Sequence, residues 1–479
     1  MASEQTDKKS STAAAAADGE QIAKKNLVIQ TILSNAASSP HKILQDINAA
    51  VNSTEGSKLV ANVLSGGVTN YSYKVKIDTQ PDLALFAKLS FEYALFNPDT
   101  HHDLARTQNE YDMMKIAREV SPNCVVTPLA CWDIEYNGKK AKLLLTEWSD
   151  ADEQFGIQFH EGSVDPRIAP QLAETIANLH TIKSFDPEFN SQVKAPIIGL
   201  LEFVKQSSIE TAKKECPSNR TEAYMAALGA DTVENILSNN IDDFKSTHDC
   251  IIHNDFHVFN IIVERKPSLE KLTTFGPNGK VIICDWEQAI AGPCGRDLGQ
   301  ALAAPIGCYI GHALNGYREA SIENYINTLL DQYFDRMAKS GKSEEELTYI
   351  YRNAIGWIGW CQFVVFYFMK IQLDAFGVET ETLQAYIQDT MGLLGLKLMR
   401  VSYDTDYVPS STNLKELKSI FTDLIEEEVT RAEDNFNSRK EKRQQRKSSL
   451  LRNSNRRVSD ASIYLEAADS LARQLSDNL

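Results

Sequence analysis

Five polar side chains interrupt the otherwise apolar stretch CIIHNDFHVFNIIV, residues 250–263. They comprise one acid, two imidazoles and two amides, namely Asp255, His253, His257, Asn254 and Asn260. A second polar segment, Asp285-Trp286-Glu287, comes later in the chain after the apolar run VIIC. Both segments follow short β-forming runs, so we expect them in loops at strand ends, where rigid elements hold reactive side chains in place.

Carboxylates and an amide in this arrangement suit phosphoryl transfer. One carboxylate must accept or orient the attacking hydroxyl, while an amide and a second carboxylate hold the magnesium ions that bridge the phosphates. Asp255 is the candidate catalytic residue for the first role. Asn260 and Asp285 are the candidate metal ligands, and Glu287 is a further candidate ligand for metal or water.

Two other interpretations of the first segment remain open at this point. Taken alone, it could be a polar turn that merely joins two strands. It could also belong to a metal-dependent hydrolase with His253, Asp255 and His257 as ligands, which would require a further His or Asp cluster. The other histidines include His101-His102 and His312, and none lies in a second compact ligand motif. The hydrolase is therefore the less favoured chemistry.

The two segments together resemble a known pair of motifs. HNDFHVFNIIV and IICDWEQAIAGP are similar to the catalytic loop and the metal-binding segment of protein-kinase-like small-molecule kinases, the superfamily of aminoglycoside phosphotransferases, choline/ethanolamine kinases and methylthioribose kinases. That superfamily has His-x-Asp-x-x-x-x-Asn followed by Asp-x-Glu or Asp-x-Asp, without the glycine of Asp-Phe-Gly in protein kinases. The resemblance covers roughly residues 60–400 and implies ATP, Mg²⁺ and a small-molecule hydroxyl as acceptor.

The same resemblance implies a nucleotide site in the first part of the chain. LSGGVTNYSYKV, residues 64–75, resembles the hairpin that covers the nucleotide in choline kinases, where glycine lets the backbone approach the phosphates. A strand lysine would pair with the phosphates and a helix glutamate would position it, with Glu119 as a rival for the glutamate. LLLTEWSD resembles the segment that links the lobes beside the adenine. The implied nucleotide-binding residues are Gly66, Gly67, Asn70, Lys88, Glu110, Glu147 and Trp148.

Four further residues are implied around the catalytic loop. His253 is expected to brace the loop through backbone hydrogen bonds. Asp297 lies in GPCGRDLG, which resembles a Gly-Pro…Gly-x-Asp-x-Gly stretch of methylthioribose kinases, and is expected to brace the same loop. His257 and Trp286, which flank the proposed catalytic and metal-binding residues, are candidates to line the substrate pocket.

The aromatic residues allow one more hypothesis. Trp286, Trp357, Trp360 and Tyr367 could form a cage for a quaternary ammonium group, as in choline sites. However, residues 357–369 are apolar on nearly every helical face, which is typical of a core helix. Core packing is therefore favoured for Trp357 and Trp360, and Trp286 is the better pocket candidate.

The elements that must position these residues form two groups. Alternating patterns on either side of a Gly-Gly turn and an Asn-Gly turn predict strands before residue 148, with one helix over 105–120. Helical spacing dominates afterwards. The fold class is α+β, a bilobed protein-kinase-like fold with an N-terminal antiparallel β-sheet lobe and a larger, mainly helical C-terminal lobe. The expected units are a disordered segment 1–20, a helical extension 21–54, a nucleotide-binding lobe 55–148, a helical lobe 149–430 and a basic Ser-rich tail 431–479 with a terminal amphipathic helix as an option.

Composition restricts the partners. The net charge is −16, although residues 435–457 carry nine Lys/Arg and one Glu, so the rest of the chain is still more acidic. Such a body is a poor candidate for nucleic acid. No secretory signal or membrane span is expected, and the eight cysteines lack zinc-ribbon spacing, so we expect reduced thiols in a cytoplasmic protein. The tail could bind a partner or be phosphorylated near Ser459 within RRVS.

The acceptor and the activity itself stay open at this level. The Gly-Gly hairpin and the HND tripeptide favour choline/ethanolamine kinases, whereas GPCGRDLG favours methylthioribose kinases, and an aminoglycoside-like acceptor is also compatible. The alternative from another functional class is a catalytically inactive kinase-like binding or regulatory protein, because such proteins retain most of the signature of the fold.

Overall fold

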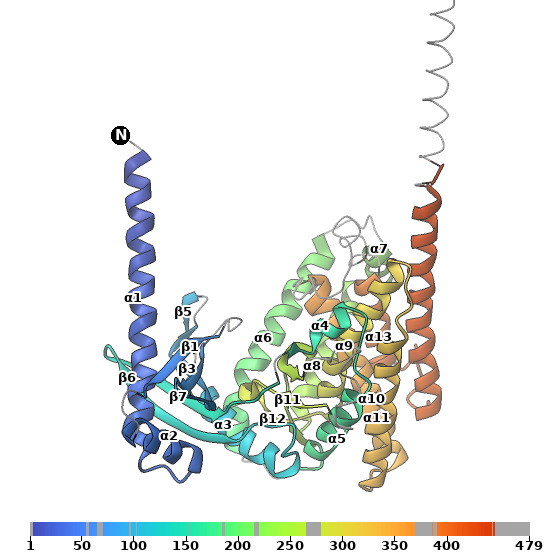
Figure 1. Ribbon diagram of the computed structural model, residues 1–479. Helices are drawn as coiled ribbons and strands as arrows, with labels where there is room; N and C mark the ends of the chain where they lie inside the picture. Colours follow the sequence, from blue (N-terminus) through green and yellow to red (C-terminus); the bar gives the residue numbers. More distant parts are fainter. Residues whose placement is uncertain are drawn as a thin grey trace, which may run out of the picture.

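The computed structural model describes residues 3–53, 57–64, 70–94, 97–101, 103–151, 153–183, 187–214, 220–264, 279–368, 386, 390–442 and 444–445. It has a β-sheet lobe and a larger helical lobe, as Figure 1 shows. The expected α+β bilobed architecture is confirmed. Gly66 and Gly67 lie outside the described residues, and so do Ser459 and the rest of the tail from 446.

An antiparallel sheet of five strands forms the first lobe. Its order is β1-β2-β3-β7-β6, so the expected hairpins are confirmed. The turn between β6 and β7 has φ 51° at Asn137 and φ 73° at Gly138, the left-handed pair that a two-residue hairpin favours. The strands of this lobe, which include a small separate hairpin, are β1 Leu59–Val63, β2 Tyr71–Ile77, β3 Gln80–Phe91, β4 Tyr93–Ala94, β5 Asn97–His101, β6 Pro128–Tyr136 and β7 Lys139–Glu147.

Two helices precede the sheet and pack against it. α1 spans Ser3–Ala36 and α2 spans Lys42–Ser53. α1 begins at Ser3, within the segment 1–20 for which disorder is expected. A run of five alanines has the highest intrinsic helix propensity and propagates a helix that is already anchored further on. That anchor includes Val28 and Ile32, which are fully buried in the core of the sheet lobe.

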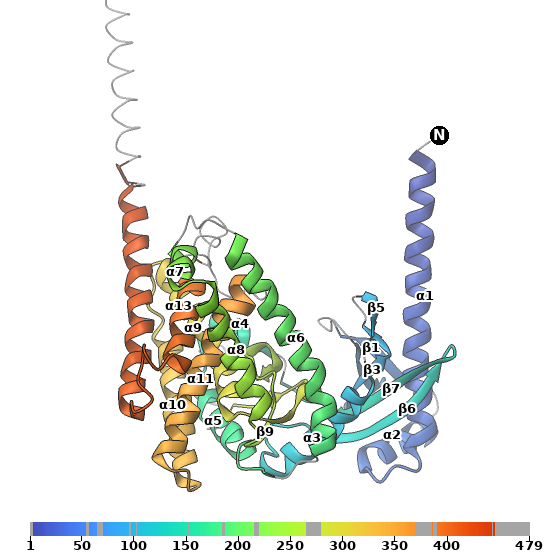
Figure 2. The same cartoon turned by 180° about the vertical axis from the view of Figure 1, so that it is seen from behind.

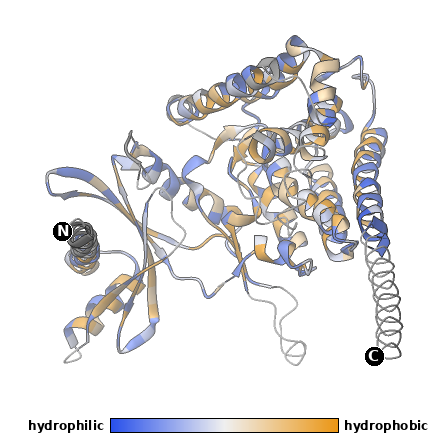
Figure 3. Cartoon of the chain, turned by 90° about the horizontal axis from the view of Figure 1, so that it is seen from above, coloured by the Kyte–Doolittle hydropathy of each residue, from blue (hydrophilic) through white to orange (hydrophobic). Residues whose placement is uncertain are grey.

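One continuous apolar core joins the helices of the second lobe. Figure 2 shows these helices from behind. Apolar and polar residues alternate along single helices in Figure 3, as expected where each helix turns one side to the core. Trp357 and Trp360 are buried in this core, which agrees with the packing role favoured above. The helices of this lobe are α4 Gly156–His160, α5 Ile168–Leu179, α6 Pro187–Lys214, α7 Arg220–Leu228, α8 Ala230–Ser246, α9 Cys294–Leu314, α10 Ala320–Lys339, α11 Glu344–Trp360 with a π-helical continuation Cys361–Phe368, and α13 Gly392–Tyr403.

A last described helix runs without interruption over residues 414–442. It buries Leu417, Phe421, Ile425 and Val429 at four-residue spacing against the helical lobe. The expected boundary at residue 430 therefore falls inside a helix that the body already holds. Among the described residues, no helix has both the length and the apolar character needed to cross a bilayer.

Short strands at the base of the helical lobe position the two polar segments. β9 Cys250–Ile252 pairs with β12 Ile290–Gly292, and β10 Ile261–Val263 pairs with β11 Val281–Ile283 and with β8 Glu153–Gln154. The register sets Ile261 opposite Ile283, so the residues just outside that pair, Asn260 and Cys284, are also adjacent. The two polar segments thus meet at one edge, as their positions after β-forming runs predicted.

Candidate active site

The loop that carries Asp255 is held from behind by one buried carboxylate. Asp297, in the first turn of α9, accepts hydrogen bonds from the backbone N–H of His253 and of Asn254, both at 2.8 Å. Its Oδ2 also lies 3.3 Å from His180 Nε2. Asp297 is fully buried, so the loop is fixed by charge-assisted bonds in a place that water does not reach.

His253 supports the same loop from inside. Its Nε2 lies 2.9 Å from the carbonyl oxygen of Cys284, and its Nδ1 accepts the backbone N–H of Asp255 at 3.3 Å. The first contact requires a proton on Nε2 and the second a lone pair on Nδ1, so the ring is neutral with a defined tautomer. Burial also lowers the pKa of His253. The two residues expected to brace the loop, His253 and Asp297, both contact its backbone.

Asn254 is a support of the loop that the sequence did not reveal. Its φ of 67° is left-handed, a conformation that asparagine tolerates better than most residues. Its side chain donates to the carbonyl of Gln288 at 3.1 Å and accepts from Arg296 Nε, while its own carbonyl accepts from Gln300 Nε2 at 3.0 Å. The only sequence signal was an asparagine between the histidine and the aspartate.

The side chain of Asp255 is the partly exposed acid of the loop, with one quarter of its surface accessible. Its Oδ2 accepts from Asn260 Nδ2 at 3.1 Å and from Gln288 Nε2 at 3.2 Å. His257 Nε2 lies 3.6 Å from Oδ1. Two amide donors therefore fix the orientation of the carboxylate and leave it open to solvent on one side. Gln288 was not among the predicted site residues.

Lys88 connects the sheet lobe to the second polar segment. From β3, its Nζ lies 2.7 Å from Glu110 of α3 (Ala105–Val120), 2.9 Å from Asp285 and 3.0 Å from Glu287. Glu110 is thus the helix glutamate in contact with this lysine, whereas the rival Glu119 is exposed near the end of α3. Lysine and glutamate meet as the resemblance implied.

Asp285 and Glu287 differ in their surroundings. Asp285 has a left-handed φ of 64°, and its side chain is 39% exposed. Burial opposes its ionisation, but the charge and hydrogen bond of Lys88, together with His253 and Arg106, outweigh burial and hold the pKa of Asp285 below its usual value. Glu287 is buried and already bound by Lys88, by Arg106 Nη2 at 2.5 Å and by Asn70 Nδ2 at 3.5 Å. Its carboxylate therefore serves as an anchor for cations and amides of the sheet lobe, and Asp285 is the more open ligand.

One predicted position needs correction. Trp286 was a candidate for the pocket wall, but it is fully buried, with Nε1 donating to the carbonyl of Ile283 at 3.0 Å and the ring packed on His253. The tight turn that exposes Asp285 directs the next side chain into the core. In the linking segment, the backbone N–H groups of Glu147 and Trp148 donate to the carbonyls of Thr127 and Ala84. The contact of this segment with adenine stays a prediction, and it would use other backbone groups.

Protonation of Glu110 gives a pH prediction. Burial, opposed by Lys88 and reinforced by Asp285 and Glu287, raises the pKa of Glu110 to about 7. Below that pH the carboxyl holds a proton; above it the proton is lost, and a bound divalent cation favours the deprotonated form. We expect the affinity for a divalent cation alone to increase as the pH rises through about 7 and binding to release a proton, measured by calorimetry in buffers of different ionisation enthalpy.

The matched variants for this measurement lie on the same helix. Glu110→Gln should remove the pH dependence, and Glu119→Gln, an exposed position, should retain it. Equal proton release by wild type and Glu110→Gln would contradict the assignment.

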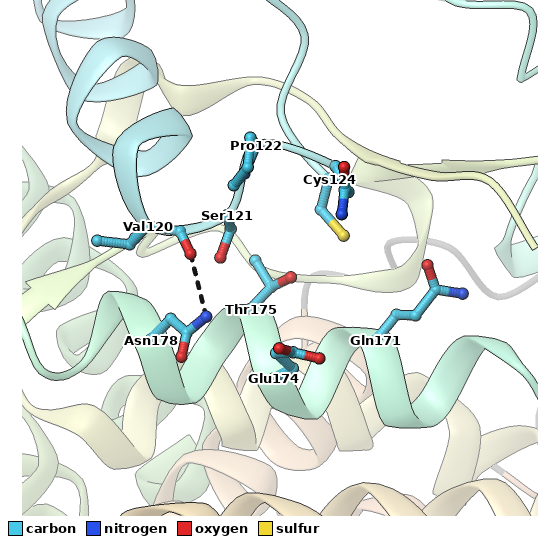
Figure 4. Close-up of a pocket in the computed structure, with 9 residues that line it drawn as sticks. Val120, Ser121, Pro122, Cys124, Gln171, Glu174, Thr175 and Asn178 are labelled. Carbon is cyan, nitrogen blue, oxygen red and sulfur yellow. Dashed lines mark hydrogen bonds between the residues drawn. The ribbon is translucent and has the colours of Figure 1, made fainter. Parts of the chain in front are cut away.

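A separate cavity lies behind α3. It has a volume of about 130 Å³ and is bounded by the turn after α3, with Ser121 and Cys124, and by the face of α5 that carries Gln171, Glu174 and Thr175 (Figure 4). Asn178 Nδ2 donates to the carbonyl of Val120 across it. None of the predicted site residues lines this cavity, so it is not the site of phosphoryl transfer.

The fold and the site now define a class, that of the protein-kinase-like phosphotransferases. The chain belongs to the Phosphotransferase enzyme family (APH), whose model matches residues 60–338. A comparison with curated proteins gives no significant match.

The chain is also similar, at low sequence identity, to solved structures that include the following three. Plasmodium vivax ethanolamine kinase is 13% identical, with 76% of this chain and 89% of that chain covered and a TM-score of 0.35. An aminoglycoside phosphotransferase from Alicyclobacillus acidocaldarius is also 13% identical, with 77% and 92% covered and a TM-score of 0.39. A thermostable mutant of aminoglycoside phosphotransferase APH(4)-Ia, in complex with AMP-PNP and hygromycin B, is 10% identical, with 74% and 97% covered and a TM-score of 0.37.

Proposed function

We propose that this protein is an ATP- and Mg²⁺-dependent cytoplasmic kinase that transfers the γ-phosphoryl group of ATP to a hydroxyl of a small molecule. The carrying observation is the state of Asp255. Its carboxylate is oriented by Asn260 and Gln288, its loop is fixed by Asp297, and it keeps an open side. This is the arrangement that positioning of an attacking hydroxyl requires.

The donor atoms at the site suit magnesium. Asn260 donates its Nδ2 to Asp255, so its amide oxygen Oδ1 is the atom left for a cation. Asp285 offers a partly exposed carboxylate. Oxygen donors of this kind are the ligands that Mg²⁺ prefers. Asn260 and Asp285 would hold the ion, with Glu287 as a support through Lys88. Bound magnesium would supply positive charge against the β- and γ-phosphates.

The chain's own residues then perform the transfer by positioning and charge. Asp255 orients the acceptor hydroxyl and accepts its proton while the hydroxyl oxygen bonds to the γ-phosphorus and the bond to the bridging oxygen breaks, leaving ADP. Lys88, held by Glu110, presents its ammonium to the phosphates. Burial opposes its charge, but Asp285, Glu110 and Glu287 raise the pKa of Lys88 well above its usual value, so it stays cationic.

The experiment is an ATP-consumption screen against choline, ethanolamine, methylthioribose, aminoglycosides and sugars. Asp255→Ala and Asp285→Ala serve as matched blanks. We expect Mg²⁺-dependent turnover with one of these alcohol classes and none with either blank. Binding of Mg²⁺·ATP without turnover on any acceptor would instead support an inactive kinase-like binding protein, and equal turnover by the blanks would refute the mechanism.

A further inference from the structure

A cluster of two thiols and an imidazole lies behind the loop brace, outside the phosphotransfer site. Ligand atoms of His180, Cys250 and Cys294 all lie within 4.8 Å of one another, and the two sulfur atoms are 3.1 Å apart. All three residues are buried. Cys250 is in β9, Cys294 begins α9, and His180 directly follows α5, so the cluster joins three elements that are separate in the sequence.

The hydrogen bonds of His180 set which ring nitrogen faces the thiols. Nε2 lies 3.3 Å from Asp297 Oδ2, and Nδ1 lies 2.8 Å from the hydroxyl of Tyr333. Asp297 can only accept, so Nε2 carries the proton and Nδ1 offers a lone pair. The Tyr333 hydroxyl interacts with Cys294 as well, so the Nδ1 side of the His180 ring lies toward the thiols.

We infer that His180, Cys250 and Cys294 form a binding site for a divalent zinc ion. Two thiolates and one neutral imidazole are the donors zinc prefers, and two thiolates cancel the charge of the ion in a buried place. His180 Nε2 donates a hydrogen bond to Asp297. Metal-bound histidines usually make such a bond with the ring nitrogen that does not bind the metal, because it fixes the tautomer and the ring orientation. Zinc at Nδ1 would replace the hydrogen bond from the Tyr333 hydroxyl, whose oxygen lies beside the site as a fourth donor.

The geometry favours a metal over a disulfide between the same cysteines. A tetrahedral zinc ion with bonds of about 2.3 Å needs sulfur atoms roughly 3.8 Å apart, a separation about 0.7 Å greater than the one present. A disulfide requires about 2.05 Å and makes no use of the histidine. The thiols are also shielded from solvent, so an oxidant has no route to them, whereas zinc can bind as the chain folds.

The Cys250–Cys294 contact brings both sulfur atoms within reach of one ion. The two Sγ atoms are 3.1 Å apart and both side chains are buried. The site then adds a second bond network behind Asp297: zinc would hold His180, His180 would hold Asp297, and Asp297 holds the backbone of the catalytic loop. Zinc would thus stabilise the loop without contacting substrate.

The test measures metal directly and does not depend on phosphotransfer. Full-length protein expressed with zinc supplied is analysed by inductively coupled plasma mass spectrometry, and cobalt-loaded protein by absorption. We expect one zinc per chain, a thiolate-to-cobalt charge-transfer band, and a lower melting temperature after chelation. Cys250→Ser and Cys294→Ser should lose the zinc, and Cys308→Ser, a buried cysteine elsewhere in α9, should retain it.

Several outcomes would overturn the assignment. These are a folded wild-type protein with neither zinc nor a cobalt band, zinc retained by the Cys250→Ser/Cys294→Ser double variant, or a Cys250–Cys294 disulfide in a non-reduced peptide map. If the serine variants do not fold, the cobalt spectrum of the wild-type protein decides alone. A wild-type protein that binds zinc but has no kinase activity would contradict the proposed function and leave the zinc site unaffected.

Discussion

Asp255→Asn should lower kcat by about 10³-fold with little change in melting temperature. The variant keeps the size of the side chain and still offers an oxygen to Asn260 or Gln288, but it cannot accept a proton from the acceptor hydroxyl. Positioned general bases contribute roughly 10²- to 10⁴-fold. The fold should survive because the side chain is partly exposed, and the loop is held through the backbone of its neighbours.

The measurement is steady-state phosphotransfer with the acceptor found in the screen, together with Mg²⁺·ATP binding by calorimetry. Asp133→Asn is the matched control, because it neutralises an acid whose side chain is 85% exposed and 2.6 Å from Lys142. Nucleotide binding should be retained in both variants. Activity of Asp255→Asn above a tenth of wild type would refute the role of Asp255 as the base.

Asp297→Ala should combine a loss of stability with a loss of activity. It leaves the backbone N–H groups of His253 and Asn254 and the Nε2 of His180 without their buried acceptor. Hydrogen bonds to a charged group contribute about 1.5–3 kcal/mol each, and breaking a buried charged network costs about 3–5 kcal/mol. We expect the free energy of unfolding of the helical lobe to decrease by about 3–5 kcal/mol.

Hydrogen exchange separates the local effect from the global one. The amides of His253 and Asn254 should lose protection in Asp297→Ala even under conditions where the lobe remains folded. Asp297→Asn should be intermediate, because one carbonyl oxygen remains and the amide N–H₂ faces two donors. Asp331→Ala, which removes an exposed ion pair with Lys418, should change stability by less than about 0.5 kcal/mol. Unchanged protection in Asp297→Ala would exclude the brace.

Contacts formed by regular local patterns were predictable from the sequence. Strand patterning located β3 and helical spacing located α3, and the family resemblance then singled out Lys88 and Glu110 before their contact was seen. The short β runs likewise placed Asp255 and Asp285 at strand ends. In each case the position follows from neighbours in the sequence or from an element of uniform period.

Contacts set by tertiary packing were not predictable. Arg106 and Glu287 are far apart in sequence, and no pattern around arginine announces a buried carboxylate partner. Trp286 was assigned to the pocket because it adjoins Asp285, but the left-handed turn at Asp285 directs it inward. Asn254 was left without a role for a related reason, since a positive φ depends on the loop as a whole.

The position of Lys88 has a consequence for ligand affinity. Lys88 belongs to the sheet lobe, whereas Asp285 and Glu287 belong to the helical lobe. The ion pairs of Lys88 therefore join the two lobes. Under the proposed function, nucleotide phosphates would compete with two internal carboxylates for one ammonium group. The apparent affinity would then be the intrinsic affinity multiplied by the fraction of molecules in which Lys88 is released. Because the same ammonium group joins the lobes, nucleotide binding and opening of the lobes would be coupled equilibria.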